Sequence, residues 1–319
     1  FQDWFGSNAG DAGLCSTGTE VVSSIPTWVY YSFFLGAIAS ITTILWSVMK
    51  TPEIPPSDEE LKLMREKKKN STFMDRVAEP FIEIYQAIGH MPKLLRNLSL
   101  VYFFQWYALF VYWQFVTPML RKSMFGISND DLSKFEAIKE SCKQGAEISA
   151  TDMSFAQNVQ NLSEQALGQT GLMNGTYNLV TMVVALALVP FASRFGNKLV
   201  YVASLVFTGI AMLSMPYITN QYLLLIPMTL FGIGWAAMMG IPYSMVSKVI
   251  PQERRGVYMG IVNMMIVIPM LIQTVSFGPI IKYLLFDNAV YAILFGGVFF
   301  ILAALFAMRL DTSEKAGLE

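Results

Sequence analysis

The chain has 319 residues and a net charge of -1, with 54% hydrophobic residues, 14% charged residues and a mean hydropathy of +0.46. These values exclude an ordinary soluble domain and indicate an integral membrane protein. The near-neutral charge gives no sign of a nucleic-acid partner.

Seven membrane-spanning helices are predicted from the runs that lack charged residues, because a span needs about 20 apolar residues. The longest of these runs, 199–247, exceeds one bilayer crossing and is divided by the turn residues between Met215 and Gln221. The expected spans are 26–49, 98–119, 171–192, 199–217, 222–247, 256–281 and 288–308.

Lys and Arg residues predict the orientation, because short cytoplasmic loops carry an excess of them. Most of them fall in 50–97, 194–198, 248–255 and the tail 310–319, and fewer fall in 120–170 and at Lys282. We therefore expect a multi-pass protein of the plasma (inner) membrane with its N-terminus outside and its C-terminus in the cytoplasm.

The first hundred residues predict an outside loop, a span and a cytoplasmic connector. Residues 1–25 are rich in Gly, Ser and Asn and form the loop, which carries Cys15. The connector 50–97 contains a capping box at Ser57 and then an amphipathic helix with apolar residues at spacings of three or four. The odd number of spans and the absence of an initiator Met predict that the chain is the back part of a larger protein.

The second span is unusual because half of the residues between Val101 and Pro118 are aromatic. Gln105, Tyr112 and Gln114 lie among them. Aromatic faces beside amides suit a sugar, whose C–H faces stack on rings and whose hydroxyls need donors and acceptors. The alternative is a bulky packed helix whose two Gln side chains bond to neighbouring helices, and the sequence leaves both interpretations open.

The connection 120–170 is polar and is expected outside, with a short helix near 130–143. It carries Cys142, so both cysteines of the chain fall on the side where oxidation is permitted. A disulfide between Cys15 and Cys142 is therefore predicted.

Three later spans carry further candidates for a substrate pathway. Asn174, Tyr177 and Asn178 share one face of the third span, and buried amides need partners. Trp235 and Tyr243 could stack a sugar, and Asn263 could bond its hydroxyls. Small or helix-breaking residues that would allow close packing or local hinges are Gly232, Ala236, Gly240, Pro242 and Pro269.

None of the seven predicted spans contains Asp, Glu, Lys, Arg or His. A membrane-embedded enzyme is therefore not expected, because paired carboxylates and His clusters are missing, and neither a cofactor nor a metal site is predicted. A seven-helix receptor, or another membrane protein without transport activity, remains an alternative.

Two motifs resemble known transporters. The segment from Pro190 to Lys198, with Arg194 and Gly196, resembles the cytoplasmic loop motif of the major facilitator superfamily, and Arg254 and Arg255 form a second basic turn. The segment Gly256 to Pro269 resembles the sugar:cation symporters of the glycoside-pentoside-hexuronide and sucrose-carrier type. Segments 232–244 and 104–110 resemble neighbouring helices of the same carriers.

The resemblance implies helices six to twelve of a twelve-helix transporter. Segment 26–49 would be the last helix of the N-terminal half, and 98–309 would be the C-terminal six-helix bundle. Such a protein carries a small neutral sugar, here a disaccharide such as sucrose or maltose, by symport with a cation, H⁺ above all, through alternating access. The acidic residue that binds the proton would lie in the absent front half, and the lipid bilayer would be the other partner.

Overall fold

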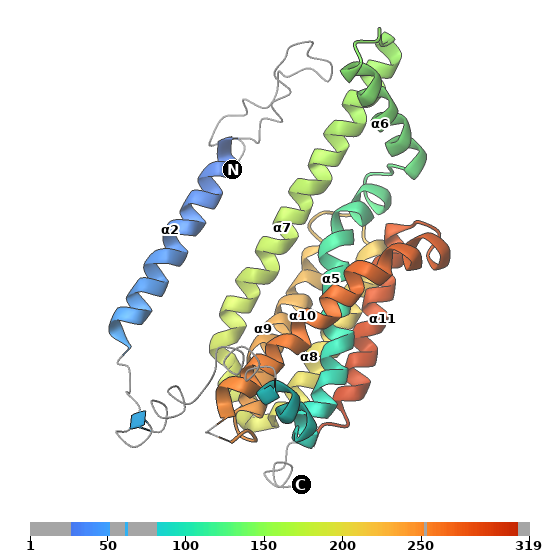
Figure 1. The fold of residues 1–319 in the computed structure, drawn as a ribbon. Coiled ribbons are helices and arrows are strands. Elements are labelled where there is room, and N and C mark those ends of the chain that lie inside the picture. Colours follow the sequence, from blue (N-terminus) through green and yellow to red (C-terminus); the bar gives the residue numbers. More distant parts are fainter. Residues whose placement is uncertain (1–26, 52–60, 63–81, 252–253, 312–319) are drawn as a thin grey trace. The chain divides into compact units, whose positions relative to one another are not determined.

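The computed structural model describes residues 27–51, 61–62, 82–251 and 254–311 (Figure 1). The predicted outside loop 1–25, the capping box at Ser57 and most of the connector lie outside these residues. The chain divides into two compact units. The first comprises residues 1–78 and 133–158, and the second comprises 79–132 and 159–319.

Seven helices in the described part of the chain are long and apolar enough to cross a membrane, which confirms the predicted number. The fold is all-helical, as expected. The seven segments are Tyr30–Lys50, Lys93–Ser123, Ala150–Phe195, Asn197–Tyr217, Leu225–Val246, Arg255–Leu284 and Ala289–Ala307.

The first unit contains α2 (Thr27–Lys50), most of α6 (Asn129–Lys143) and the start of α7 (Ala150–Phe195). Ile138, Cys142 and Ala156 form a small apolar cluster between α6 and α7. Lys134 of α6 pairs with Asp152 of α7 at 3.0 Å. The short helix expected near 130–143 is therefore present, and it packs against the beginning of the next long helix.

Helix α7 is longer than expected, because it runs without interruption through 46 residues from Ala150 to Phe195. The sequence indicated a span over 171–192 that followed a polar loop. No proline precedes Pro190 within this helix, so nothing in the backbone stops it earlier. At about 1.5 Å per residue the helix is roughly 70 Å long, about twice the thickness of a hydrocarbon core, so a large part of it must lie beyond the membrane.

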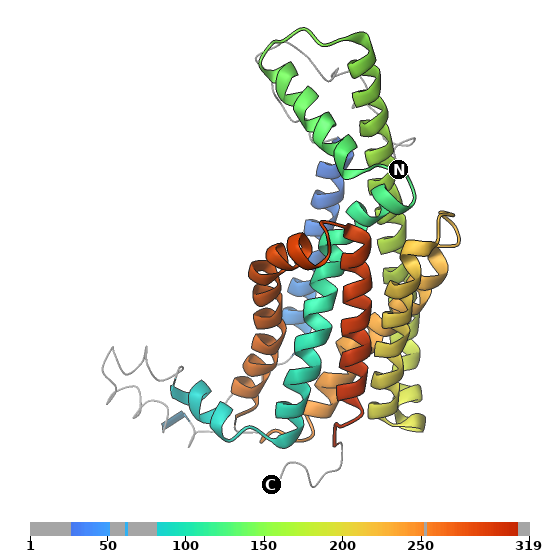
Figure 2. The same cartoon turned by 90° about the vertical axis from the view of Figure 1, so that its right-hand side faces the viewer.

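The second unit is a helical bundle in which α5 (Lys93–Ser123) contacts α10 (Arg255–Pro279) and α11 (Ala289–Ala307). Helix α8 (Asn197–Ser214) packs against α9 (Leu225–Val246) and α11. Figures 1 and 2 show α5 and α11 side by side through most of their length. The core of the bundle is formed by large side chains of α5, including Tyr102 and Tyr112, which are fully buried.

Glycines of α11 set the approach of α8 to the bundle. A Cβ at Gly296 would lie 2.6 Å from Met212 Cε, and one at Gly297 would lie 2.7 Å from Leu213 Cγ. Between α8 and α9, a Cβ at Gly234 would overlap Thr208 Oγ1. Such contacts are typical of membrane helices, which gain stability from close backbone packing rather than from expulsion of water.

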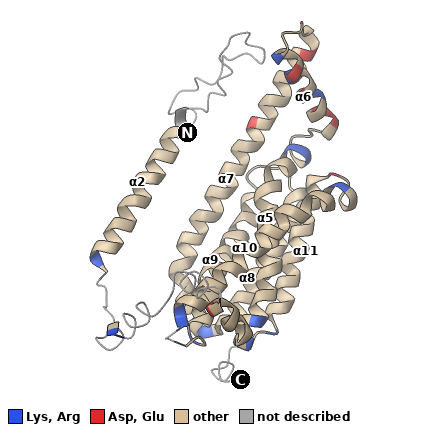
Figure 3. Ribbon diagram, viewed as in Figure 1, with Lys and Arg blue, Asp and Glu red and all other residues tan. Residues whose placement is uncertain are grey.

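The charged residues lie toward the ends of the bundle helices (Figure 3). At one of these ends α10 continues as a π-helical segment, Ile280–Leu284, which carries Lys282. The turn after it holds Phe286 and Asp287 at φ of 55° and 51°, the only non-glycine residues with positive φ in the described part of the chain. This turn leads into α11, where the N–H of Val290 donates to the capping Asn288 Oδ1 at 3.1 Å.

Candidate functional site

An aromatic cluster surrounds Trp235 of α9 in the second unit. Its ring lies 5.9 Å from that of Trp113, 6.0 Å from that of Trp106 and 6.5 Å from that of Tyr177, all close to edge-to-face. Trp113 is 38% exposed, whereas Trp106 and Tyr177 are buried. The cluster therefore joins α5, α7 and α9 and presents ring surface at its open side.

Two hydrogen-bonded pairs of polar side chains join helices of the same unit. Tyr243 of α9 donates its hydroxyl to Asn263 Oδ1 of α10 at 3.1 Å. Gln273 of α10 donates Nε2–H to Gln114 Oε1 of α5 at 3.1 Å. Gln114 and Asn263 are exposed, and Gln273 is fully buried. Gln273 was missed as a candidate by sequence reasoning, although its polar side chain within an apolar run was a signal.

On α7, Asn174 and Asn178 are held near the aromatic cluster. Asn174 Oδ1 accepts a hydrogen bond from the hydroxyl of Tyr112 at 3.0 Å. Asn178 is exposed and donates Nδ2–H to the carbonyl of Asn174 at 2.8 Å. Tyr177, between them, packs against Phe231 with ring centroids 5.2 Å apart and the rings tilted by 52°. The three polar residues expected on one face of this span thus remain close together.

Two of the predicted sugar contacts lie inside the bundle. Gln105 is fully buried, and its Oε1 accepts from Tyr201 of α8 at 2.5 Å. Tyr112 is also fully buried, with its ring 4.6 Å from that of Phe231. Both side chains contact neighbouring helices, Gln105 with α8 and Tyr112 with α9. This agrees with the alternative interpretation of the second span as a packed helix whose polar side chains bond to its neighbours.

Several buried polar atoms of α5 lack a hydrogen-bond partner within the described residues. They are Tyr102 Oη, Gln105 Nε2, Trp106 Nε1 and, in the last turn of the helix, Arg121 Nε. An unpaired buried donor costs about 1 to 3 kcal/mol, so such atoms are normally matched by water or ligand. Trp106 belongs to the aromatic cluster around Trp235, and sequence reasoning had not separated it from the other aromatic residues of the span.

The small residues of α9 face α7. A Cβ at Gly232 would lie 2.6 Å from the carbonyl oxygen of Tyr177, and Thr181 Oγ1 donates to the carbonyl of Gly232 at 3.0 Å. A Cβ at Gly240 would lie 2.9 Å from Leu188 Cδ2, and Ala236 is buried on the same stripe. Both predicted prolines, Pro242 in α9 and Pro269 in α10, lie buried inside their helices.

The connection between α7 and α8 is a single residue, Gly196, at φ 84°. This conformation favours glycine and explains the tight turn at the loop motif. Arg194 lies over the ring of Phe195 at 5.5 Å, and Lys198 is the second residue of α8. On the other basic turn, Arg254 is the N-cap of α10 and Arg255 its first residue, and both are exposed.

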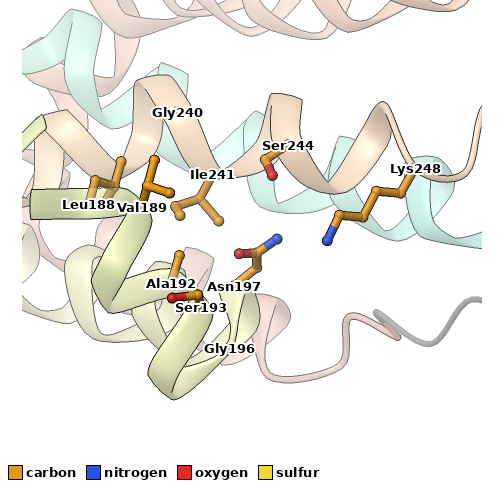
Figure 4. A pocket seen from close by; sticks show the side chains of 10 residues that line it. All are labelled: Leu188, Val189, Ala192, Ser193, Gly196, Asn197, Gly240, Ile241, Ser244 and Lys248. Carbon is orange, nitrogen blue, oxygen red and sulfur yellow. The ribbon is translucent and has the colours of Figure 1, made fainter. Parts of the chain in front are cut away.

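Beside the Gly196 turn is a cavity of about 480 Å³ between α7, α8 and α9 (Figure 4). Leu188, Val189 and Ile241 line one part of it, and Asn197, Ser244 and Lys248 line the other. In Figure 4 the Lys248 amine points toward Asn197. The cavity therefore grades from an apolar to a polar wall.

Two further sequence predictions concern cysteine and metal chemistry. Cys142 is 7% exposed and is not a free thiol, whereas Cys15 lies outside the described residues, so their pairing stays a prediction. Among the described residues no group of three or more His, Cys, Asp or Glu side chains is arranged to hold a metal ion. The candidate residues around Trp235, Tyr243 and Gln114 carry aromatic rings, amides and hydroxyl groups.

The seven long apolar helices define a polytopic membrane protein. The family model of the Major Facilitator Superfamily matches residues 147–318, and the chain belongs to this superfamily. It is a membrane transporter and not an enzyme. The seven-helix receptor considered as an alternative is thereby excluded. No curated protein and no solved structure matches the chain significantly.

Proposed function

We propose that the chain is the C-terminal part of a sugar:cation symporter and that the face around Trp235 contacts the sugar. The observation that supports this proposal is that ring surface and uncharged amide or hydroxyl groups are exposed or half-buried on four helices of the same unit, at Trp113, Gln114, Asn178, Tyr243 and Asn263, which we call the sugar face. Rings stack on the C–H face of a pyranose, and amides and hydroxyls pair with its hydroxyl groups.

The absence of charge in this face favours a neutral solute. A buried or half-buried ion would need an opposite charge or several dipoles to offset its desolvation, and the described face offers only neutral partners. The buried Nε1–H of Trp106, which has no partner among the described residues, is a further donor next to the cluster. A disaccharide, with many hydroxyls and two ring faces, fits this chemistry better than a small carboxylate or an amine.

Coupling to a cation is assigned to residues outside the described spans. A proton-coupled carrier needs a titratable group near the middle of the membrane, and the seven predicted spans carry none. We propose that a preceding half supplies this group. The two halves would then alternate access to a site between them, with the N-terminus of this chain outside and its C-terminus in the cytoplasm.

Uptake into vesicles that contain the full-length protein tests this function. Labelled sucrose and maltose are presented with an inward proton gradient, with a sodium gradient and with neither, and a labelled amino acid serves as the control solute. The proposal predicts saturable sugar uptake that the proton gradient accelerates. Sugar uptake that never saturates under any gradient would reject the sugar, and saturable uptake driven only by sodium would reject the proton.

A further inference from the structure

We propose that a second site, at the end of the bundle where α5 meets the α10–α11 turn, binds a small oxyanion such as phosphate. A cavity of about 140 Å³ lies there between the last turn of α5, the start of α6 and the residues around Asp287. Arg121 and Lys122 of α5 both line it. None of the residues that line this cavity is among the proposed sugar contacts, and the site does not rest on the proposed function.

Both cations are unpaired. Neither Arg121 nor Lys122 forms an ion pair within the described residues, and Asp287, which lines the same cavity, forms none either. The Nε atom of Arg121 is buried and has no hydrogen-bond partner in the described structure. An arginine remains charged under all ordinary conditions, so a buried N–H of its guanidinium is costly unless an acceptor reaches it.

The position of these cations at the carboxyl end of α5 has a simpler contribution, because cations there interact favourably with the helix dipole. That interaction is available to an exposed side chain and does not account for a buried Nε–H or for a cavity beside it. An oxyanion would fill the cavity and accept a hydrogen bond from the buried Nε–H, because a guanidinium fork presents N–H groups that match phosphate and carboxylate oxygens.

The far wall of the cavity is a strained turn. Phe286 and Asp287 both occupy left-handed backbone, a conformation that costs free energy for residues other than glycine and that is concentrated at functional sites. Asn129 Nδ2 donates to the carbonyl of Asp287 at 2.8 Å, which ties this turn to the start of α6. Asp287 and Asn129 therefore line the same cavity as Arg121 and Lys122.

Size and charge define the class of ligand. The volume is several times the roughly 30 Å³ share of one water molecule and well below the roughly 300 to 1,000 Å³ of pockets for drug-sized ligands. Two cations and one carboxylate leave an excess of one positive charge. A single phosphate group fits these limits, either free or as the headgroup of a lipid whose chains remain in the membrane.

Equilibrium binding to the purified chain in detergent tests the site and separates the two sources. Labelled inorganic phosphate is titrated in one arm and dihexanoyl phosphatidic acid in the other, at fixed ionic strength with chloride as the competing anion. We expect saturable binding of at least one probe and a matching rise in the unfolding temperature. Binding of only the phosphatidic acid assigns the site to a lipid headgroup, and binding of phosphate assigns it to the free ion.

Variants identify the residues. R121Q should weaken binding about tenfold to a hundredfold, because hydrogen bonds to charged groups contribute that much. R96Q, the same change at an exposed position of the same helix, should leave binding unchanged. D287N should strengthen binding, because it removes the opposing carboxylate while Asn tolerates the left-handed backbone.

Two results would overturn the site. One is the absence of saturable binding of both probes by the unsubstituted chain. The other is equal affinity in R121Q and the unsubstituted chain. If R121Q does not fold, K122Q and D287N decide, because the site requires them to change affinity in opposite directions.

Discussion

Gln273 Nε2 of α10 lies 3.1 Å from Gln114 Oε1 of α5, so two amides more than one hundred and fifty positions apart are bonded across the bundle. The buried Gln273 side chain donates this hydrogen bond and so fixes the exposed Gln114 side chain. Gln114 faces outward with its amide N–H₂ available, and its carbonyl oxygen is fixed by Gln273. In the proposed sugar face, Gln273 would therefore position the side chain of Gln114.

Replacing Gln273 should therefore affect sugar affinity more than folding. We expect Q273M to raise KM for the transported disaccharide about two- to tenfold, the value of one hydrogen bond to a neutral group. The effect on the free energy of unfolding should stay below about 1.5 kcal/mol, as for other hydrogen bonds between membrane helices. T274V is the control, because the Thr274 hydroxyl bonds only within its own helix. Equal effects of both changes on KM would contradict the role.

The contact between α7 and α9 predicts unequal effects at two glycines. G232A places a Cβ 2.6 Å from the carbonyl oxygen of Tyr177, a backbone atom that cannot move alone, so we expect a loss of about 1 to 3 kcal/mol in the free energy of unfolding. G240A meets only the mobile end of Leu188 and should cost less. Thermal unfolding in detergent measures both. A larger loss for G240A would show that the close contact lies elsewhere.

The ion pair between α6 and α7 predicts an acid-dependent interaction. A hydrogen bond from Lys134 to Asp152 lowers the pKa of that carboxyl below its ordinary value, helped by Ser149. Because the pKa of Asp152 is lower in the folded than in the unfolded protein, the ion pair stabilises the packing of α6 against α7 at pH values above the unfolded pKa, about 3.9. This contribution is lost as the pH falls through the folded pKa.

Carbon-detected NMR titration of the Asp152 carboxyl checks this directly. K134Q should raise the pKa of Asp152 toward its ordinary value. K139Q, the same change on the same helix, should leave it unaltered, because Lys139 lies over the ring of Phe135 instead. An Asp152 pKa that does not respond to K134Q would refute the assignment.

The cysteine prediction is open to a simple chemical test. If Cys15 and Cys142 are bonded, the intact protein should take up no alkylating reagent before reduction and two equivalents after it, as measured by mass. C142S should abolish the difference between the two conditions. Two alkylated thiols in the unreduced protein would exclude the bond.

The number and approximate position of the spans could be predicted because each is a charge-free apolar run. The true length of α7 could not be read from such runs, since its first part is polar. Its start was nevertheless encoded: Ser149 bonds Asp152 in a capping box, and Ser128 bonds Asp131 in the same way at the start of α6. These two S-x-x-D sequences could have located both helices.

The sequence could predict which residue types are candidates for substrate contact, but it could not predict which of them are buried. Gln105 and Gln114 look equivalent in sequence, yet Gln105 points into the bundle toward Tyr201 and Gln114 lies on the exposed face. The difference depends on how α5 is rotated between α8 and α10. That rotation follows from packing of distant segments and not from local spacing.

The most direct test of the sugar face is the initial rate of saturable disaccharide uptake by proteoliposomes containing the full-length protein with W235A. We predict that this change removes most of the saturable uptake, because the Trp235 ring holds together the aromatic residues of α5 and α7 that are proposed to contact the sugar. The comparison is made with protein that remains folded. W46A, on an exposed position of α2, should retain it. Uptake by W235A equal to that of the unsubstituted protein would contradict the proposed site.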